Sequence, residues 1–193
     1  MTPVHSFPGF LHSVELQREQ EGWRSNAYPF SLPALKGWDR LAFHPNVTFF
    51  VGENGSGKST LVEAIAVALG CNPEGGSKDH AFASRHTRSA LHRFVKLIRP
   101  GKRPTDVFFL RAESFYQTSS FLDDEGDHRY TGGAKLHALS HGQSFMALFQ
   151  HGFEGASLYI LDEPEAALSP SRQLGFLSPL HDLVRAQSQL IIA

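Results

Sequence analysis

Hydrophobic residues recur along the chain with two different spacings, which predict strands that alternate with helices. Short runs of β-branched, aromatic and aliphatic residues predict strands at residues 47–51, 107–111, 158–161 and 190–192. Hydrophobic residues three and four positions apart predict helices at residues 59–69, 89–97, 140–150 and 171–186. This alternation is typical of an α/β protein with a mixed β-sheet core flanked by helices.

The first fifty residues follow a different pattern. Short strands are expected there at residues 14–16, 28–32 and 41–43, ahead of the strand at 47–51. We therefore expect a single domain over residues 1–193, with a β-rich N-terminal lobe at 1–50 and a core at 51–193. Residues 72–80 and 119–136 are rich in Gly, Asp, Ser and Lys and predict loops.

A glycine-rich segment connects the strand at 47–51 to the helix at 59–69. Its residues fit the phosphate-binding pattern GxxxxGK[ST] at every fixed position: Gly52, Glu53, Asn54, Gly55, Ser56, Gly57, Lys58 and Ser59. Glycines let successive N–H groups turn toward an anion, and the helix N-terminus that follows, at Thr60, adds unpaired donors. We expect Lys58 to reach the β- and γ-phosphates and the Ser59 hydroxyl to bind Mg²⁺. The segment therefore predicts an ATP- or GTP-binding P-loop.

An acidic pair ends the apolar strand at 158–161. In open parallel α/β sheets ligands bind outside the carboxyl ends of the strands, so Asp162 and the P-loop are expected to meet over one nucleotide. Asp162 would hold Mg²⁺ through water, and Glu163 would polarise the attacking water as the catalytic residue. The alternative interpretation is a capped strand end followed by a turn at Pro164.

A third motif, Leu139-Ser140-His141-Gly142-Gln143-Ser144, precedes the acidic strand. A Ser hydroxyl, a glycine and a helix N-terminus together can form a second anion site, which one nucleotide in one chain does not need. Read alone, the segment is a helix N-cap in which Ser140 and Gln143 form a capping box.

Composition narrows the class of protein only slightly. Eighteen basic against nineteen acidic residues give a net charge of −1, so no global basic field indicates nucleic-acid binding. One local basic cluster is best explained as a solvated helix face rather than a DNA-contacting surface; its members are Arg85, His86, Arg88, His92, Arg93, Lys96, Arg99, Lys102 and Arg103.

The single cysteine, Cys71, excludes an intramolecular disulfide and is expected to be packed. The eleven histidines lack metal-ligand spacing. Without an apolar run near 18 residues or a secretory signal, a cytoplasmic protein with no membrane span is expected.

Together the three motifs resemble those of the ATP-binding-cassette ATPases, whose signature is usually LSGGQ. Within that superfamily the chain is similar to the soluble branch that includes the SbcC-like and structural-maintenance-of-chromosomes ATPases, and most to the short predicted AAA-family ATPases of bacteria. The match covers about residues 41–193 and depends on FFVGENGSGKSTLVEAIAVALG, FFLRAESFY and LYILDEPEAALSPSRQL.

This resemblance implies an ATP-dependent homodimer in which each ATP lies between one chain's P-loop and the other chain's signature. Ser140, His141, Gly142 and Gln143 would then contact the γ-phosphate across the interface, and residues 167–169 would connect the two sites. Hydrolysis to ADP and phosphate would open the dimer. DNA repair and phage defence are pathways suggested by analogy only, and nucleic acid stays an open partner.

Several positions depart from the family pattern. His141 replaces the first signature glycine, Ser169 stands where relatives often have Asp, and the glutamine loop is unclear, with Gln117 favoured over Glu113 and Ser114. Relatives continue from the last strand into a switch histidine, whereas this chain reaches Ala193 first, so the resemblance implies a truncated end and weak or absent hydrolysis by these residues.

Two alternative functions stay open at this point: a nonhydrolytic nucleotide-dependent switch, and the energy subunit of a transporter. The adenine contact is also open, and its aromatic or arginine candidates are Arg18, Trp23, Tyr28 and Trp38.

Overall fold

The computed structural model describes residues 7–77, 89–124, 136 and 139–193. Its main sheet has five strands in the order β3-β8-β7-β6-β4. Four of them run parallel: β3 (Val47–Phe49), β8 (Gln189–Ile192), β7 (Leu158–Asp162) and β6 (Val107–Arg111). The short β4 (Gly76–Ser77) pairs antiparallel with β6 at the edge. The predicted α/β core with a mixed sheet is therefore present.

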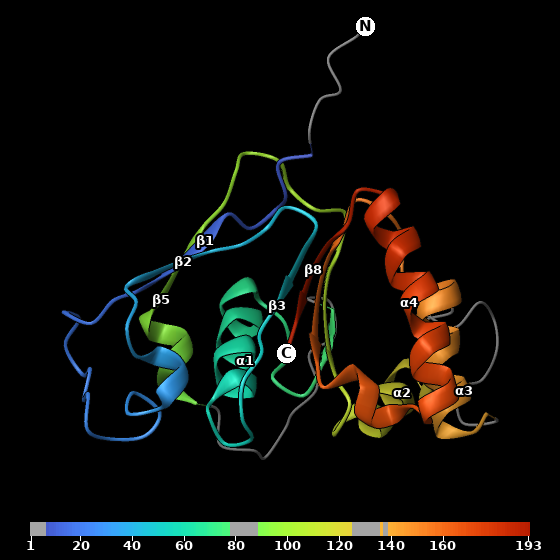
Figure 1. Cartoon of the computed structure of the whole chain (residues 1–193), viewed down its shortest axis with the longest axis horizontal. Helices are drawn as coiled ribbons and strands as arrows, with labels where there is room; N and C mark the ends of the chain where they lie inside the picture. Colours follow the sequence, from blue (N-terminus) through green and yellow to red (C-terminus); the bar gives the residue numbers. More distant parts are fainter. Residues whose placement is uncertain (1–6, 78–88, 125–135, 137–138) are drawn as a thin grey trace, which may run out of the picture.

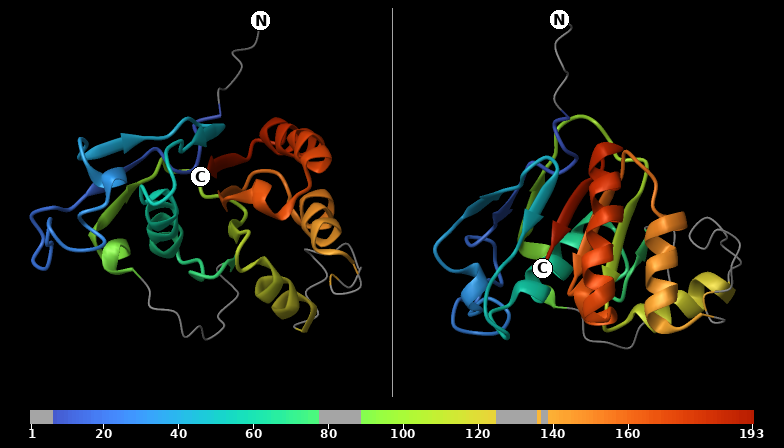
Figure 2. Two further views of the ribbon diagram at one scale, coloured as in Figure 1. Left: turned by 60° about the horizontal axis from the view of Figure 1, so that its bottom comes forward. Right: turned by 45° about the vertical axis from the view of Figure 1, so that its right-hand side comes forward.

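Helices cover both faces of this sheet (Figure 1). One face carries α1 (Lys58–Leu69), and the other carries α2 (Phe115–Asp124), α3 (His141–Ala147) and α4 (Pro170–Arg185). A π-helical turn, Leu148–Gly152, extends α3. Figure 2 shows α3 and α4 side by side on their face.

Side chains alternate between the two faces along each strand, as the two-residue period of a strand requires. Phe109, Ile160 and Ile191 belong to the hydrophobic cluster on the α1 side. Their chain neighbours Phe108, Tyr159 and Leu190 belong to the cluster beneath α3 and α4. Near-continuous apolar strands of this kind are expected when both faces of a parallel sheet are buried.

A second sheet lies on the other side of α1 (Figure 1). It is antiparallel, with the order β2-β1-β5, and comprises β1 (Ser13–Leu16), β2 (Arg40–Ala42) and β5 (Val95–Ile98). Two of its strands come from the first fifty residues, and the third comes from the segment after α1. Helix α1 is therefore packed between two sheets.

Four predicted elements are wrong at least in part. The predicted loop at 72–80 contains the short strand β4, and residues 78–80 lie outside the described residues. Residues 28–32 form turns instead of a strand, leading to the 3₁₀ helix Pro33–Leu35, because Pro29 and Pro33 lack the N–H that a sheet ladder needs. The predicted helix at 89–97 is the 3₁₀ helix Ala90–Phe94 followed by β5. Part of the predicted loop at 119–136 belongs to α2, and the rest lies outside the described residues except for Leu136.

The correction at 89–97 also changes the basic cluster. Lys96 lies on β5 rather than on a helix, and its Nζ is 3.3 Å from Glu15 Oε2 on β1. Arg85, His86 and Arg88 lie outside the described residues. The predicted packing of Cys71 is confirmed, since its side chain is buried. None of the described helices has both the length and the hydrophobicity needed to cross a bilayer.

A buried glutamine joins the main sheet to the chain segment that leads into β1. Gln189 on β8 has no exposed surface. Its Oε1 accepts hydrogen bonds from the N–H groups of Phe10 (2.7 Å) and Leu11 (2.8 Å). Its Nε2 donates to the carbonyls of Leu11 (2.8 Å) and His44 (3.0 Å). All four hydrogen-bonding positions of the amide are therefore used.

We expect Gln189→Leu to lower the free energy of unfolding by at least about 2 kcal/mol, because it leaves several buried backbone groups unpaired. Urea denaturation followed by circular dichroism measures the change. The matched variant Gln20→Leu, at an exposed position, should stay within about 0.5 kcal/mol of wild type. Equal stabilities of the two variants would contradict the role assigned to Gln189.

Candidate functional site

The glycine-rich loop lies between β3 and α1, as predicted, and its backbone depends on glycine. Gly55 and Gly57 have positive φ values of 78° and 99°. A Cβ on Gly57 would lie 2.9 Å from Leu32 Cβ, so the position needs glycine for its contact as well as for its conformation. The loop is fixed further by the Ala34 N–H, which donates to the Ser56 carbonyl at 2.8 Å.

Lys58, the first residue of α1, folds back over this loop. Its Nζ donates to the carbonyls of Gly52 (2.8 Å) and Glu53 (3.0 Å). The ammonium group is thereby held at the mouth of the loop, beside the helix N-terminus. Both features favour an anion at the same place.

The structure brings the loop and the end of the acidic strand together. A cavity of about 280 Å³ is lined by the loop and by Glu163, which follows β7. Its lining residues from the loop and the start of α1 are Asn54, Gly55, Gly57, Lys58, Ser59 and Thr60, and the others are Tyr28 and Leu32. The loop and Glu163 are about a hundred positions apart in the sequence. They meet because parallel strands present their carboxyl ends at one edge of the sheet.

Asp162, the last residue of β7, directly precedes Glu163 but is absent from the described lining of this cavity. Its side chain is buried, and the residue is only 3% exposed. Oδ2 accepts a hydrogen bond from Arg111 Nε at 3.0 Å. Oδ1 is buried with no hydrogen-bond partner among the described residues. A carboxylate oxygen in this position is available to a cation or to a bound water.

Arg111 connects Asp162 to a second acidic residue. The Arg111 Nη2 donates to Glu63 Oε2 on α1 at 3.0 Å. Burial of the guanidinium works against its charge, but Asp162 and Glu63 outweigh that effect, so the pKa of Arg111 is raised above its usual value. The three side chains thus form an ion-paired group with one more negative than positive charge.

Oxygen ligands of the kind that Mg²⁺ prefers are available here. Ser59 lies in the first turn of α1, and the unpartnered Oδ1 of Asp162 supplies a carboxylate oxygen. Within the described part of the chain, no group of three or more His, Cys, Asp or Glu side chains could hold a metal alone. A magnesium ion here would therefore share its ligands with phosphates and water, as Mg²⁺ usually does.

Glu163 has an unusual backbone conformation, with φ 50° and ψ 47°. This left-handed region costs a non-glycine residue about 1–3 kcal/mol and is concentrated at functional sites. The Glu163 N–H donates to the Ala193 carbonyl at 2.9 Å, and the 3₁₀ helix Pro164–Ala167 follows. The exposed side chain is one wall of the loop cavity.

The predicted signature residues lie elsewhere. Residues 140–143 are absent from the described lining of the loop cavity. They form the start of α3, on the opposite face of the sheet from α1 (Figure 1). Gln143 Oε1 accepts a hydrogen bond from the Ser140 N–H at 3.0 Å, which is the contact expected for a capping box. A Cβ on Gly142 would lie 3.5 Å from the Ala167 carbonyl, so this helix start borders the segment that follows the acidic pair.

The glutamine-loop candidates differ in their surroundings. Gln117 is exposed on α2 and lines none of the cavities near the loop. The Ser114 hydroxyl donates to the Glu74 carbonyl. Glu113 is exposed and lies two residues beyond Arg111, the last residue of β6.

The four candidates for adenine contact divide into two pairs. Arg18 bonds to Asp39 and to two carbonyls, and Trp23 packs on Phe30 with their ring centroids 4.5 Å apart. Tyr28 is exposed and lines the loop cavity. Trp38 lines a separate apolar cavity of about 310 Å³ on the other side of the loop. Of these four candidates, only Tyr28 and Trp38 line a cavity that borders the loop.

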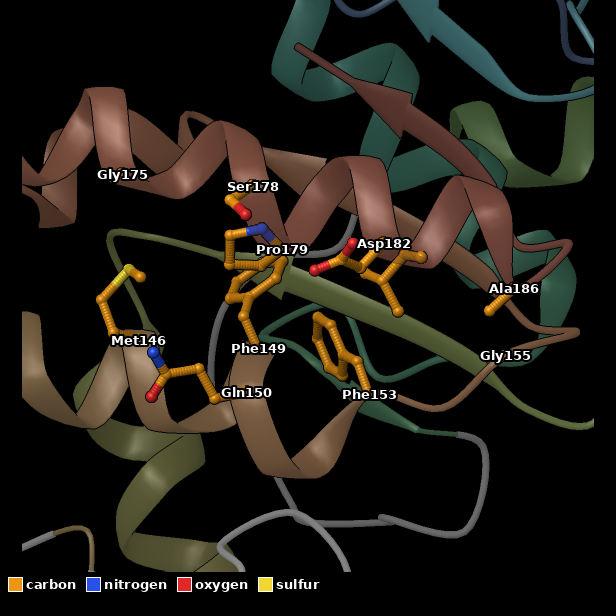
Figure 3. Close-up of a pocket in the computed structure, with 11 residues that line it drawn as sticks. Met146, Phe149, Gln150, Phe153, Gly155, Gly175, Ser178, Pro179, Asp182 and Ala186 are labelled. Atoms are coloured by element: carbon orange, nitrogen blue, oxygen red, sulfur yellow. The ribbon is translucent and has the colours of Figure 1, made fainter.

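A larger groove, of about 450 Å³, lies between α4 and the π-helical turn (Figure 3). Its walls include Phe149 from the turn, Phe153 directly after it, and Pro179 and Asp182 from α4. The groove shares no lining residue with the loop cavity. It is therefore separate from the candidate site.

Sequence reasoning missed Arg111 and Glu63. A signal for Arg111 was present, because a charged residue at the end of a predicted buried strand must emerge at the same edge as Asp162. Glu63 had a weaker signal, as an acidic residue in the otherwise apolar run of residues 61–69. Neither fits any of the three motifs.

Comparison with known proteins supports the central part of this site. The family model described as AAA domain matches residues 29–121, which include the glycine-rich loop, α1 and β6. The same comparisons found no curated protein and no solved structure that matches the chain. Residues 29–121, slightly less than half of the chain, are therefore similar to the AAA-domain family.

Proposed function

We propose that this chain binds ATP with Mg²⁺ at the loop of residues 52–60 and hydrolyses it to ADP and phosphate. The AAA-domain match suggests a nucleotide-binding ATPase in general terms. One observation carries the more specific proposal: Glu163 shares a single cavity with Gly57, Lys58 and Ser59. An anion cradle and a carboxylate are thereby placed within reach of one phosphate group.

Phosphate binding follows from the donors at the loop. The first N–H groups of α1 have no partner within the helix, and the positive end of the helix dipole favours an anion there. Lys58 would exchange its bonds to the Gly52 and Glu53 carbonyls for bonds to phosphate oxygens. A bond between the ammonium group and a charged phosphate oxygen is stronger than one to a neutral carbonyl.

Ser59 and Asp162 would hold the magnesium ion, with Oδ1 of Asp162 facing it directly or through water. When bound, Mg²⁺ supplies positive charge where the transferring phosphoryl group accumulates negative charge. Glu163 would orient the attacking water and accept its proton. The left-handed backbone at Glu163 gives its side chain a direction different from that of Asp162.

A second copy of the chain would complete the site. Ser140 and Gly142 start a helix on the far face of the sheet, but they border Ala167, just after the acidic pair. The N-terminus of α3 is therefore near the carboxyl edge of the sheet without entering its own loop cavity. We infer that it serves the γ-phosphate held by the loop of a second copy, as the resemblance to cassette ATPases implies.

Substitution of Lys58 tests nucleotide affinity. Lys58→Ala should weaken ATP binding about 10- to 100-fold, because it removes a hydrogen bond between two charged groups. Isothermal titration calorimetry with ATP and Mg²⁺ measures this. The control Lys96→Ala removes an equally charged side chain from β5 and should bind like wild type. Equal affinities of wild type and Lys58→Ala would contradict the proposal.

Substitution of Glu163 tests whether two copies of the chain form an ATP-dependent dimer. Glu163→Gln should bind ATP but hydrolyse it slowly, so dimers should accumulate with ATP and Mg²⁺ and not with ADP. Light scattering after size-exclusion chromatography gives the mass. A monomer that binds ATP tightly under all conditions would argue against the dimer and support a nonhydrolytic switch.

A further substitution in the Glu163→Gln background tests the contact between copies. Ser140→Arg should abolish the ATP-dependent dimer, because it places a bulky charge at the start of α3. The matched control Ser178→Arg changes an exposed serine in the C-terminal half of α4 and should leave the dimer intact. Dimers that persist with Ser140→Arg would place the interface elsewhere.

A further inference from the structure

We propose that Arg111 is a positioning residue for the magnesium ligand Asp162 and that Glu63 is its counter-charge. The inference rests on the proposed function, since it concerns how the chain holds the ion beside ATP. It adds two residues that lie outside the three sequence motifs.

Strand register places Arg111 beside Asp162. The two are paired neighbours on the parallel strands β6 and β7, and the Ala112 N–H donates to the Asp162 carbonyl at 3.1 Å. The bond from Arg111 Nε occupies Oδ2 of the carboxylate at 3.0 Å. Only Oδ1 is left without a partner among the described residues. The arginine therefore determines which oxygen is offered to the ion and fixes the plane of the carboxylate.

Glu63 compensates the positive charge of Arg111. An arginine beside a metal ligand repels the cation that the ligand must bind. Glu63 Oε2 lies 3.0 Å from Arg111 Nη2, and both side chains are largely buried, at 15% and 20% exposure. The Glu63–Arg111 pair is neutral, so the negative charge of Asp162 remains for the ion.

The planar guanidinium is suited to this role. Nε carries one N–H and Nη2 carries two, all fixed in one plane, and here Nε bonds Asp162 while Nη2 bonds Glu63 on a different element. Arg111 also lies over the ring of Phe109, with Cζ 5.7 Å from the centroid. A lysine has one charged atom and could not reproduce both contacts in fixed directions.

Arg111→Met is the test, because methionine keeps the length and the packing but removes the charge and the donors. The quantity measured is the ratio of the ATP dissociation constant in EDTA to that in Mg²⁺, by fluorescence titration with a labelled ATP. Loss of a residue that orients a metal ligand typically costs about 10- to 100-fold in metal affinity, so the ratio should fall by about that factor. Binding in EDTA, which depends on the loop, should stay close to that of wild type.

Two further variants separate positioning from stability. Glu63→Gln leaves the Arg111 charge uncompensated and should lower the ratio less than Arg111→Met does; a raised ratio would overturn the counter-charge role. Leu183→Ala makes a cavity under α4, on the other face of the sheet, and should lower the unfolding midpoint without changing the ratio.

The outcomes are distinguishable from failure of the proposed function. If wild type does not bind ATP, the proposed function fails and this inference falls with it. If wild type binds ATP with a clear magnesium dependence that Arg111→Met retains, the positioning role alone is overturned.

Discussion

A buried carboxylate is the constraint on which the candidate site depends. Asp162 is 3% exposed, and an uncompensated charge in such a place costs several kcal/mol. Arg111 offsets the charge from the paired position on β6, and Glu63 offsets Arg111 from α1. The register of β6 against β7 therefore fixes the electrostatics of the site. It also explains why α1 carries an acidic residue, Glu63, that contacts the sheet through Arg111.

Helices cover both faces of the main sheet, and this arrangement determines which helix N-termini lie close together within one chain. Alternating side chains bury α1 on one face and α3 and α4 on the other, so the helix that starts at Lys58 and the helix that starts after Ser140 are separated by the sheet. The start of α3 is accordingly absent from the described lining of the loop cavity in the same molecule. Helix packing, rather than any property of the loop, is thus the physical reason to invoke a second copy.

The sequence predicted those parts of the molecule that depend on interactions between residues close together in the chain. The loop of residues 52–59 was identified by spacing, and β6, β7 and β8 by continuous apolar runs, because each signal lies within a few residues. The error at residues 28–32 overlooked a local signal, because Pro29 and Pro33 cannot donate to a sheet ladder. The error at residues 89–97 and the omission of Arg111 occurred where tertiary context decides. Residues 95–98 form a strand because β1 offers a pairing edge, which periodicity over so few residues cannot reveal. Arg111 was missed because its role depends on a strand about fifty residues away.

The site is arranged before any nucleotide binds. Gly57 is held against Leu32, Lys58 is anchored to two loop carbonyls, and Glu163 is held in a strained backbone by its bond to Ala193. Pre-arranged groups lose less conformational entropy on binding, so more of the interaction energy appears as affinity. The exception is Lys58, whose bonds to the loop must break as those to phosphate form. Under the proposed function, a ligand without a phosphate at that position could not replace these bonds, so the same lysine would favour ligands that carry a phosphate there.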